Sequence, residues 1–210
     1  MKGTGSVITS GQLGAFGEGG VSFDNSYLDA LSGPIFAGSE EGSVSFDSAH
    51  IATAGGLAIR TGGGEDDHPD SMGRVKARCV RENEGGNIDI ADATIVADRF
   101  VKLNSGGSIT ADYSSISPYS TISSPVDPAT YIALAAEGPI SADGATWTAP
   151  ASIFLGSEEG NITAASATMS ATGTPGTITF YAGGGTITVS NSTFQGVVQY
   201  QPTGVTVIGP

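Results

Sequence analysis

The sequence has a single cysteine, few basic residues and no long apolar run, and each shortage excludes a class of protein. Cys79 is the only cysteine among 210 residues, so no internal disulfide forms and packing must hold the fold together. The 8 Lys and Arg residues face 21 Asp and Glu residues, and the net charge of −13 opposes binding to nucleic acid or to an anionic membrane. No stretch approaches the roughly 18 apolar residues of a spanning helix, so we expect no membrane span.

Helical periodicity is scarce too, and strand-forming residues bounded by turn residues take its place. The chain contains 32 glycines, but they follow no strict three-residue period, which excludes collagen. The hydrophobic fraction of 39% recurs in a fixed pattern, which excludes a disordered chain. Residues 1–6 lack the apolar core of a signal peptide, which favours assembly in the cytoplasm unless an export signal lies outside this sequence.

An apolar residue two positions after a glycine recurs along the chain, and we take it as the anchor of a repeat. Most intervals between anchors are 21 to 25 residues, and the interval of 44 between Val44 and Ile88 indicates one coil with a large insertion or two coils, one of them degenerate. The anchors are Val7, Val21, Val44, Ile88, Ile109, Ile140, Ile162 and Ile187.

Positions that did not define the anchor also repeat, which is the stronger test. The residue two after the anchor is apolar, the residue five after is small, and the residue seven after is large and apolar, as in Phe46, Ala49 and Ile51. Val7 fails these tests, so we assign it to an atypical capping coil. Alternation predicts two short strands with inward positions 0, +2, +5 and +7, and a third strand such as 101–103 precedes the next glycine.

The turn residues of the repeat predict two corners in each coil. We expect the glycine before the anchor to supply a positive φ where the chain turns back. We expect the aspartates three after the anchor to form Asx turns, in which the carboxylate accepts from the backbone two residues later. These aspartates are Asp24, Asp47, Asp112 and Asp143.

The repeat predicts an all-β fold, a right-handed single-stranded parallel β-helix, or solenoid, of about seven to eight coils with a charged insertion. We assign one domain to residues 1–210. It comprises an N-terminal capping coil at 1–18, regular coils at 19–200, a charged insertion with a basic strand at 60–82, and a C-terminal cap at 201–210.

Phrases such as Glu84-Gly85-Gly86-Asn87-Ile88 and residues 184–189 resemble the β-helical segments of filamentous-haemagglutinin-type adhesins and of phage tailspikes and other virion proteins. The resemblance covers residues 19 to about 200. The resemblance is specific for architecture but weak for function, because this fold hosts many activities. It implies a homo-oligomer, with a trimer favoured.

Charge gathers in one segment, because seven of the eight Lys and Arg residues lie between positions 60 and 102. A charged loop that leaves a regular scaffold is a common place for a binding site. After it, Val75, Ala77 and Cys79 alternate with Lys76 and Arg78, which predicts a strand with a basic outer stripe. The alternative is a solvated insertion whose charges neutralise one another. The expected interface residues are Arg60, Asp66, Asp67, His68, Asp70, Arg74, Lys76, Arg78 and Arg81.

The sequence gives less support to other candidate binding, metal or catalytic sites. A proline-rich excursion at about 117–130 could form a lateral contact, but we expect a plain long turn. The acidic pairs at 40–41 and 158–159 could hold calcium or act as a glycosidase acid and base, but we favour a water-facing turn that keeps the edge soluble. His50 and His68 lack partners for a zinc site or a triad, and Cys79 is expected to be a buried thiol.

The sequence therefore favours a non-enzymatic structural or surface-binding protein without a cofactor. We expect a phage virion component, a capsid decoration protein or spike made in the host cytoplasm, whose partners are other virion or surface proteins and which could also bind polysaccharide. The alternatives are a segment of a secreted bacterial adhesin at the cell surface and a polysaccharide-binding or polysaccharide-cleaving tailspike.

Overall fold

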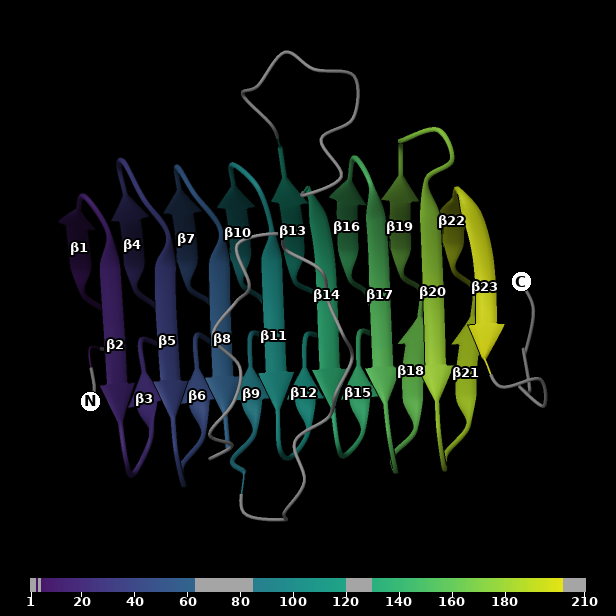
Figure 1. Ribbon diagram of the computed structural model, residues 1–210, viewed down its shortest axis with the longest axis horizontal. Coiled ribbons are helices and arrows are strands. Elements are labelled where there is room, and N and C mark those ends of the chain that lie inside the picture. The colour runs from purple at the N-terminus through teal and green to yellow at the C-terminus, as the bar shows by residue number, and fades with distance from the viewer. Residues whose placement is uncertain (1–2, 4, 63–84, 120–129, 202–210) are drawn as a thin grey trace.

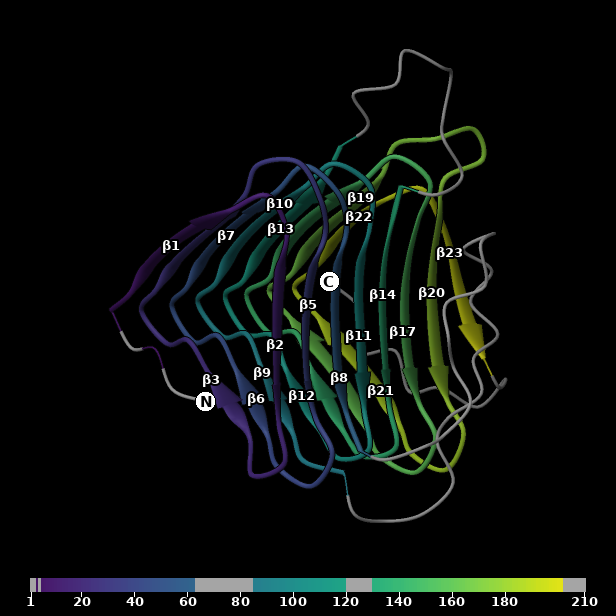
Figure 2. The ribbon, with the colours of Figure 1, turned by 60° about the vertical axis from the view of Figure 1, so that its left-hand side comes forward.

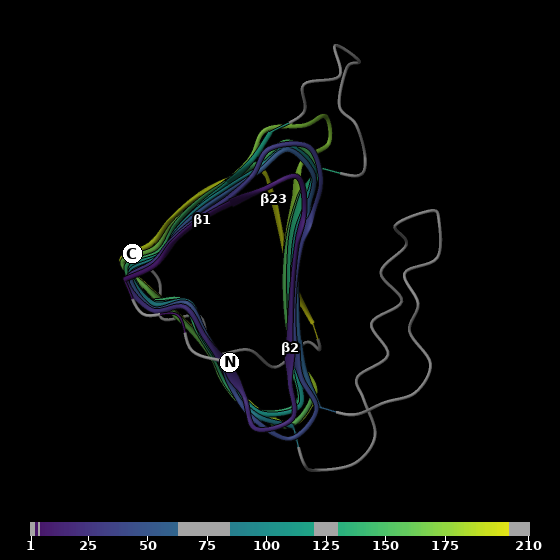
Figure 3. The ribbon, with the colours of Figure 1, turned by 90° about the vertical axis from the view of Figure 1, so that its left-hand side faces the viewer.

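In a computed structural model, which describes residues 3, 5–62, 85–119 and 130–201, the chain winds into a parallel β-solenoid of about seven turns (Figure 1). Three parallel sheets run along the stack, and each turn contributes one strand to each sheet. Figure 2 shows the stacked turns obliquely, and seen along the axis they nearly superimpose on a triangular outline (Figure 3). The front strands run down and the rear strands run up as the chain advances away from its N-terminal end, so the coil is right-handed, as predicted.

Sheet I holds the strands that follow the first corner of each coil. Its strands are β1 (Val7–Ser10), β4 (Tyr27–Ala30), β7 (His50–Thr53), β10 (Thr94–Ala97), β13 (Ser115–Pro118), β16 (Thr146–Ala149), β19 (Thr168–Ala171) and β22 (Thr193–Gln195). Sheet II follows in each coil. Its strands are β2 (Leu13–Gly17), β5 (Ile35–Ser39), β8 (Leu57–Thr61), β11 (Val101–Ser105), β14 (Tyr131–Ala136), β17 (Ser152–Ser157), β20 (Thr177–Ala182) and β23 (Val197–Gln201).

Sheet III is made of shorter strands that begin at the anchors. Its strands are β3 (Val21–Ser22), β6 (Val44–Ser45), β9 (Ile88–Asp89), β12 (Ile109–Thr110), β15 (Ile140–Ser141), β18 (Ile162–Ala165) and β21 (Ile187–Ser190). The seven anchors from Val21 onward are all buried and stack in one column. No helix long and apolar enough to cross a membrane occurs in the described part of the chain.

The core consists of the inward columns that the repeat predicted. The column seven after the anchor runs through Ile95, Ile116, Trp147 and Met169, all at most 1% exposed. The Trp147 indole N–H donates to the Ser114 hydroxyl in the neighbouring coil at 3.0 Å, so the largest buried side chain has its one polar atom satisfied. Like stacks on like, and each coil buries the apolar face of the next.

The long interval between Val44 and Ile88 belongs to a single coil. Val44 pairs directly with Ile88, and β7 pairs with β10 and β8 with β11, so no degenerate coil intervenes. The described chain leaves the stack at Gly62 and rejoins it at Gly85. A Cβ placed on Gly62 would lie 3.3 Å from the Gly85 Cα, so the two ends of the insertion are neighbours. The interval between Ile109 and Ile140 is likewise one coil.

The prediction for the glycine before the anchor was wrong. Of these glycines only Gly5 has a positive φ, and Val7 after it is no anchor, because it pairs with Tyr27 and points outward, 76% exposed. Apart from Gly19, where an added Cβ would meet nothing, the other glycines are needed because successive coils approach closely at this corner. A Cβ on Gly86 would overlap the Gly42 carbonyl, and a Cβ on Gly185 would overlap that of Gly160.

Gly20 and Gly62 have a positive φ near this corner, but the regular series of positive φ angles lies at the opposite end of sheet III, four residues after each anchor from Val21 onward. They form a column of left-handed residues of mixed type that turns each coil from sheet III into sheet I, and Gly5 begins this column in the first coil, since Val7 two residues later pairs with Tyr27. After Gly5 the column is Asn25, Ser48, Asp92, Tyr113, Gly144, Ser166 and Asn191.

Candidate functional site

The candidate site is the outer face of sheet II around β8 and β11. Arg60 on β8 and Lys102 on β11 both point outward on these adjacent strands, because their neighbours Ile59 and Leu103 are buried. The register places Arg60 opposite Asn104 and Lys102 opposite Ala58, so the two cations are diagonal neighbours on one face. Arg99 is exposed at the corner just before β11. Each Lys or Arg in the described part of the chain is therefore on or beside this face.

An aromatic pair borders the cations. Phe100 and Tyr131 stack with ring centroids 5.7 Å apart, at the end of sheet II where β11 and β14 begin. A Cβ on Gly56 would come within 2.5 Å of the Phe100 ring, so the ring lies flat over that glycine. Tyr131 is 8% exposed, and burial raises the pKa of its hydroxyl. The face thus combines cationic side chains with a rigid apolar support.

Of the nine interface residues that the sequence predicts, Arg60 is within the described residues. The other eight belong to segment 63–84, outside the described residues, and stay predictions. They are Asp66, Asp67, His68, Asp70, Arg74, Lys76, Arg78 and Arg81. The structure adds that this segment leaves and rejoins the stack beside the cationic face, because Gly62 follows directly after Arg60 and Thr61 at the end of β8.

The aspartates at the corner between sheets III and I bind the next coil. Asp112 accepts from the Asp143 backbone N–H at 2.8 Å and from the Ser141 hydroxyl at 2.6 Å, and Asp143 accepts from the Ala165 N–H at 2.7 Å. Asp24 accepts from the Asp47 N–H at 3.1 Å. The predicted Asx turns at Asp24, Asp112 and Asp143 are therefore wrong, because these carboxylates accept from a backbone N–H one coil away rather than two residues on. Asp47 accepts from the hydroxyl of the adjacent Ser48 at 3.3 Å.

The third coil of this row has Ala91 at the aspartate position, and its carboxylate is that of Asp89. It is one residue after its anchor and accepts from the Ala91 N–H at 3.0 Å, which is an Asx turn. Burial raises the pKa of the Asp89 carboxyl, and repulsion from Asp47, Asp24 and Asp112 adds to the rise, while the Ala91 hydrogen bond opposes it. The corner is thus a line of neighbouring carboxylates held by backbone and serine donors.

The glutamate pairs lie at another corner, where sheet II turns into sheet III. The Glu41 N–H donates to the Glu18 carbonyl and the Glu159 N–H donates to the Glu137 carbonyl, so the pairs form two separate groups. Two coils lie between these two groups, and at this corner they have Gly62 and Gly106 in place of a glutamate. Within the described ranges, no group of three or more His, Cys, Asp or Glu side chains is placed to hold a metal ion.

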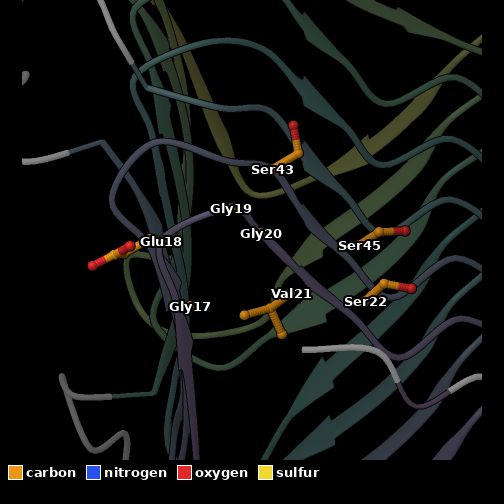
Figure 4. Close-up of a pocket in the computed structure, with 8 residues that line it drawn as sticks. All are labelled: Gly17, Glu18, Gly19, Gly20, Val21, Ser22, Ser43 and Ser45. Atoms are coloured by element: carbon orange, nitrogen blue, oxygen red, sulfur yellow. The ribbon is translucent and has the colours of Figure 1, made fainter.

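A small open pocket lies at the N-terminal end of the stack, lined by residues 17–22 with Ser43 and Ser45 (Figure 4). The Ser22 and Ser45 side chains point to the same side, whereas Glu18 points away from them (Figure 4). Both serine hydroxyls donate to the Asp24 carboxylate, so they serve the corner. His50 points outward on sheet I and stacks on Tyr27 with ring centroids 4.8 Å apart.

Sequence reasoning missed a row of buried hydroxyls that close the corner between sheets II and III. The Ser157 hydroxyl donates to the Gly138 carbonyl at 2.8 Å and accepts from the Gly160 N–H at 2.9 Å, and Ser39 plays the same part with Glu18 and Gly42. Their signal was present in part, since Ser39 and Ser157 each come three positions before one of the repeat glycines. Comparison with known proteins found no matching family model, no matching curated protein and no matching solved structure.

Proposed function

We propose that this protein is a non-enzymatic structural protein that binds an acidic partner surface through the outer face of sheet II around Arg60 and Lys102. The observation that carries the proposal is the gathering of the described cations on one face of a chain whose net charge is −13. Opposite charges across an interface steer the encounter and fix its register. The charged insertion leaves the stack at Gly62 and rejoins it at Gly85, beside this face.

The partner we propose is another virion or surface protein, with the chain working as a homo-oligomer on a phage particle. The support for this setting is the solenoid architecture, which the chain has in common with the virion and adhesin β-helices that its repeats resemble. The neighbouring genes test the setting. Capsid and tail genes beside this one support the phage particle, whereas a single long exported gene that contains this segment supports the adhesin.

The cationic face is tested with an anionic polymer as the probe, because the natural partner is not identified. Binding to a dextran-sulfate surface is measured by biolayer interferometry across a range of salt concentrations. We expect the wild type to bind at low salt and the Arg60→Gln/Lys102→Gln pair to bind roughly tenfold more weakly, with a shallower salt dependence.

The matched control is the Thr148→Glu/Thr168→Glu pair on the outer face of sheet I. Both pairs change the net charge by two units, from −13 to −15, so overall charge cannot explain a difference between them. Equal losses in the two pairs, or a wild type that does not bind at low salt, would remove the cationic face from the proposal.

A further inference from the structure

The two ends of the stack expose strand edges. At the N-terminal end β1 and β2 each have a neighbour on one side only, and at the C-terminal end the same holds for β22 and β23 within the described residues. Unpaired edges offer free backbone donors and acceptors to another strand, and natural sheets usually protect them with charged side chains or proline.

Neither end carries that protection in the described chain. Residues 5–17 and residues 186–201 contain no charged residue and no proline, although the whole chain has 21 acidic and 8 basic residues. Large apolar side chains are exposed there instead: Val7 at 76% and Phe16 at 69% on the first coil, and Val197 at 50% on the last. Over these described residues both edges therefore lack charge and proline, and each exposes apolar side chains among uncharged polar ones.

The inward columns also continue to both ends. Ile8 and Leu13 at the N-terminal end are only partly buried, as are Phe194, Val198 and Tyr200 at the C-terminal end. They occupy the positions that are almost fully buried in every inner coil, as Ile51 and Leu57 show. Among the described residues, no further coil covers these positions at either end.

We propose that copies of this chain stack head to tail, with the C-terminal coil of one copy on the N-terminal coil of the next. The columns identify a second copy as the partner, because Phe194 shares a column with Ile8, Val198 with Leu13 and the large Tyr200 with the small Ala15.

The turns superimpose along the axis, so pairing two strands of one sheet brings the other sheets into register as well (Figure 3). Such a heterologous contact does not close on itself and yields linear oligomers. This inference does not depend on the cationic face of sheet II, which lies on the side of the stack.

The test is the molar mass as a function of protein concentration, measured by light scattering after size-exclusion chromatography. Reductant is present throughout, because Cys79 could link chains covalently. We expect the mass to rise with concentration through multiples of 20.9 kDa.

Leu13→Lys blocks the N-terminal end and Val198→Lys blocks the C-terminal end, since an inward charge on an edge strand opposes pairing. Each variant alone should remain at 20.9 kDa.

Mixing the two variants distinguishes head-to-tail stacking from other contacts. Each variant keeps the end that the other has lost, so the mixture should form a dimer and nothing larger. If two N-terminal ends met instead, Val198→Lys would still dimerise alone, and that result would overturn the head-to-tail arrangement.

The exposed pair Val7→Lys/Phe16→Lys repeats the N-terminal block without touching the core, in case Leu13→Lys fails to fold by circular dichroism. Thr148→Lys in the middle of sheet I is the control and should stack like the wild type. A wild type that stays at 20.9 kDa at every concentration, or a control that blocks stacking equally well, would overturn the proposal.

Discussion

The outer faces of sheets I and II cover the same core, yet their side chains differ in kind. From β10 to β22 the outer positions of sheet I are uncharged, and hydroxyl side chains such as Thr146, Thr148 and Thr168 predominate. The outer positions of sheet II include Arg60, Lys102 and several aromatic rings. Inward columns are nearly the same in all coils, so the fold depends on the inside while the outside is free to specialise.

The largest effect is expected when an inward position is emptied. Trp147 is fully buried and packs between Ile116 and Met169 in the column of sheet I. Trp147→Ala should lower the free energy of unfolding by about 3–5 kcal/mol, through lost burial and the cavity that remains. Thr148→Ala changes the adjacent outward residue and should cost less than about 1 kcal/mol. Guanidinium denaturation followed by circular dichroism measures both, and similar losses would contradict the division into inside and outside.

The next effect concerns the close approach of the coils at the corner before sheet III. Gly86→Ala places a Cβ on the Gly42 carbonyl, so the coils must separate locally, at a cost of about 2–3 kcal/mol. Gly19 occupies the same position in the first coil, where nothing lies within 4 Å of an added Cβ.

Gly19→Ala should therefore be almost neutral in the same denaturation experiment. If Gly19→Ala destabilised the protein as much as Gly86→Ala, the glycines would be required for backbone conformation, as the sequence first suggested, and not for the approach of neighbouring coils.

These two positions also show how far the sequence could reach. Inward positions were predictable, because a solenoid repeats similar side chains at one spacing and burial acts on each of them alike. The role of the glycines was not, because their steric conflict is with a different coil and depends on how the coils stack. The left-handed corner residues include Ser48, Asp92 and Tyr113, and no common residue type marks the position.

The candidate site was predictable in part for the same reason. The density of basic residues between positions 60 and 102 indicated the region, and Arg60 was named. Lys102 was left out of the predicted interface, since 42 positions separate it from Arg60 and only the pairing of β8 with β11 makes the two neighbours. Charge density is visible in a sequence, but the register that brings charges to one face is not.

The smallest effect is expected at the acidic corner, where Asp89 is half-buried among other carboxylates. Its pKa is raised above the ordinary value of 3.8, first by burial and then by repulsion from Asp47, Asp24 and Asp112. As pH rises from 3.8, the unfolded chain releases this proton before the folded chain does, so the carboxyl's contribution to stability is lost as pH passes through the folded pKa.

Asp89→Asn should therefore be slightly more stable than the wild type at about pH 7. The difference should vanish at about pH 3, where the Asp89 carboxyl is protonated in both the folded and the unfolded chain. The amide oxygen of asparagine can still accept from the Ala91 N–H, so the substitution removes the charge and keeps the turn. Denaturation at the two pH values measures the difference. A variant that is less stable than the wild type at pH 7 would mean that the hydrogen bond from Ala91 outweighs burial and repulsion at this corner.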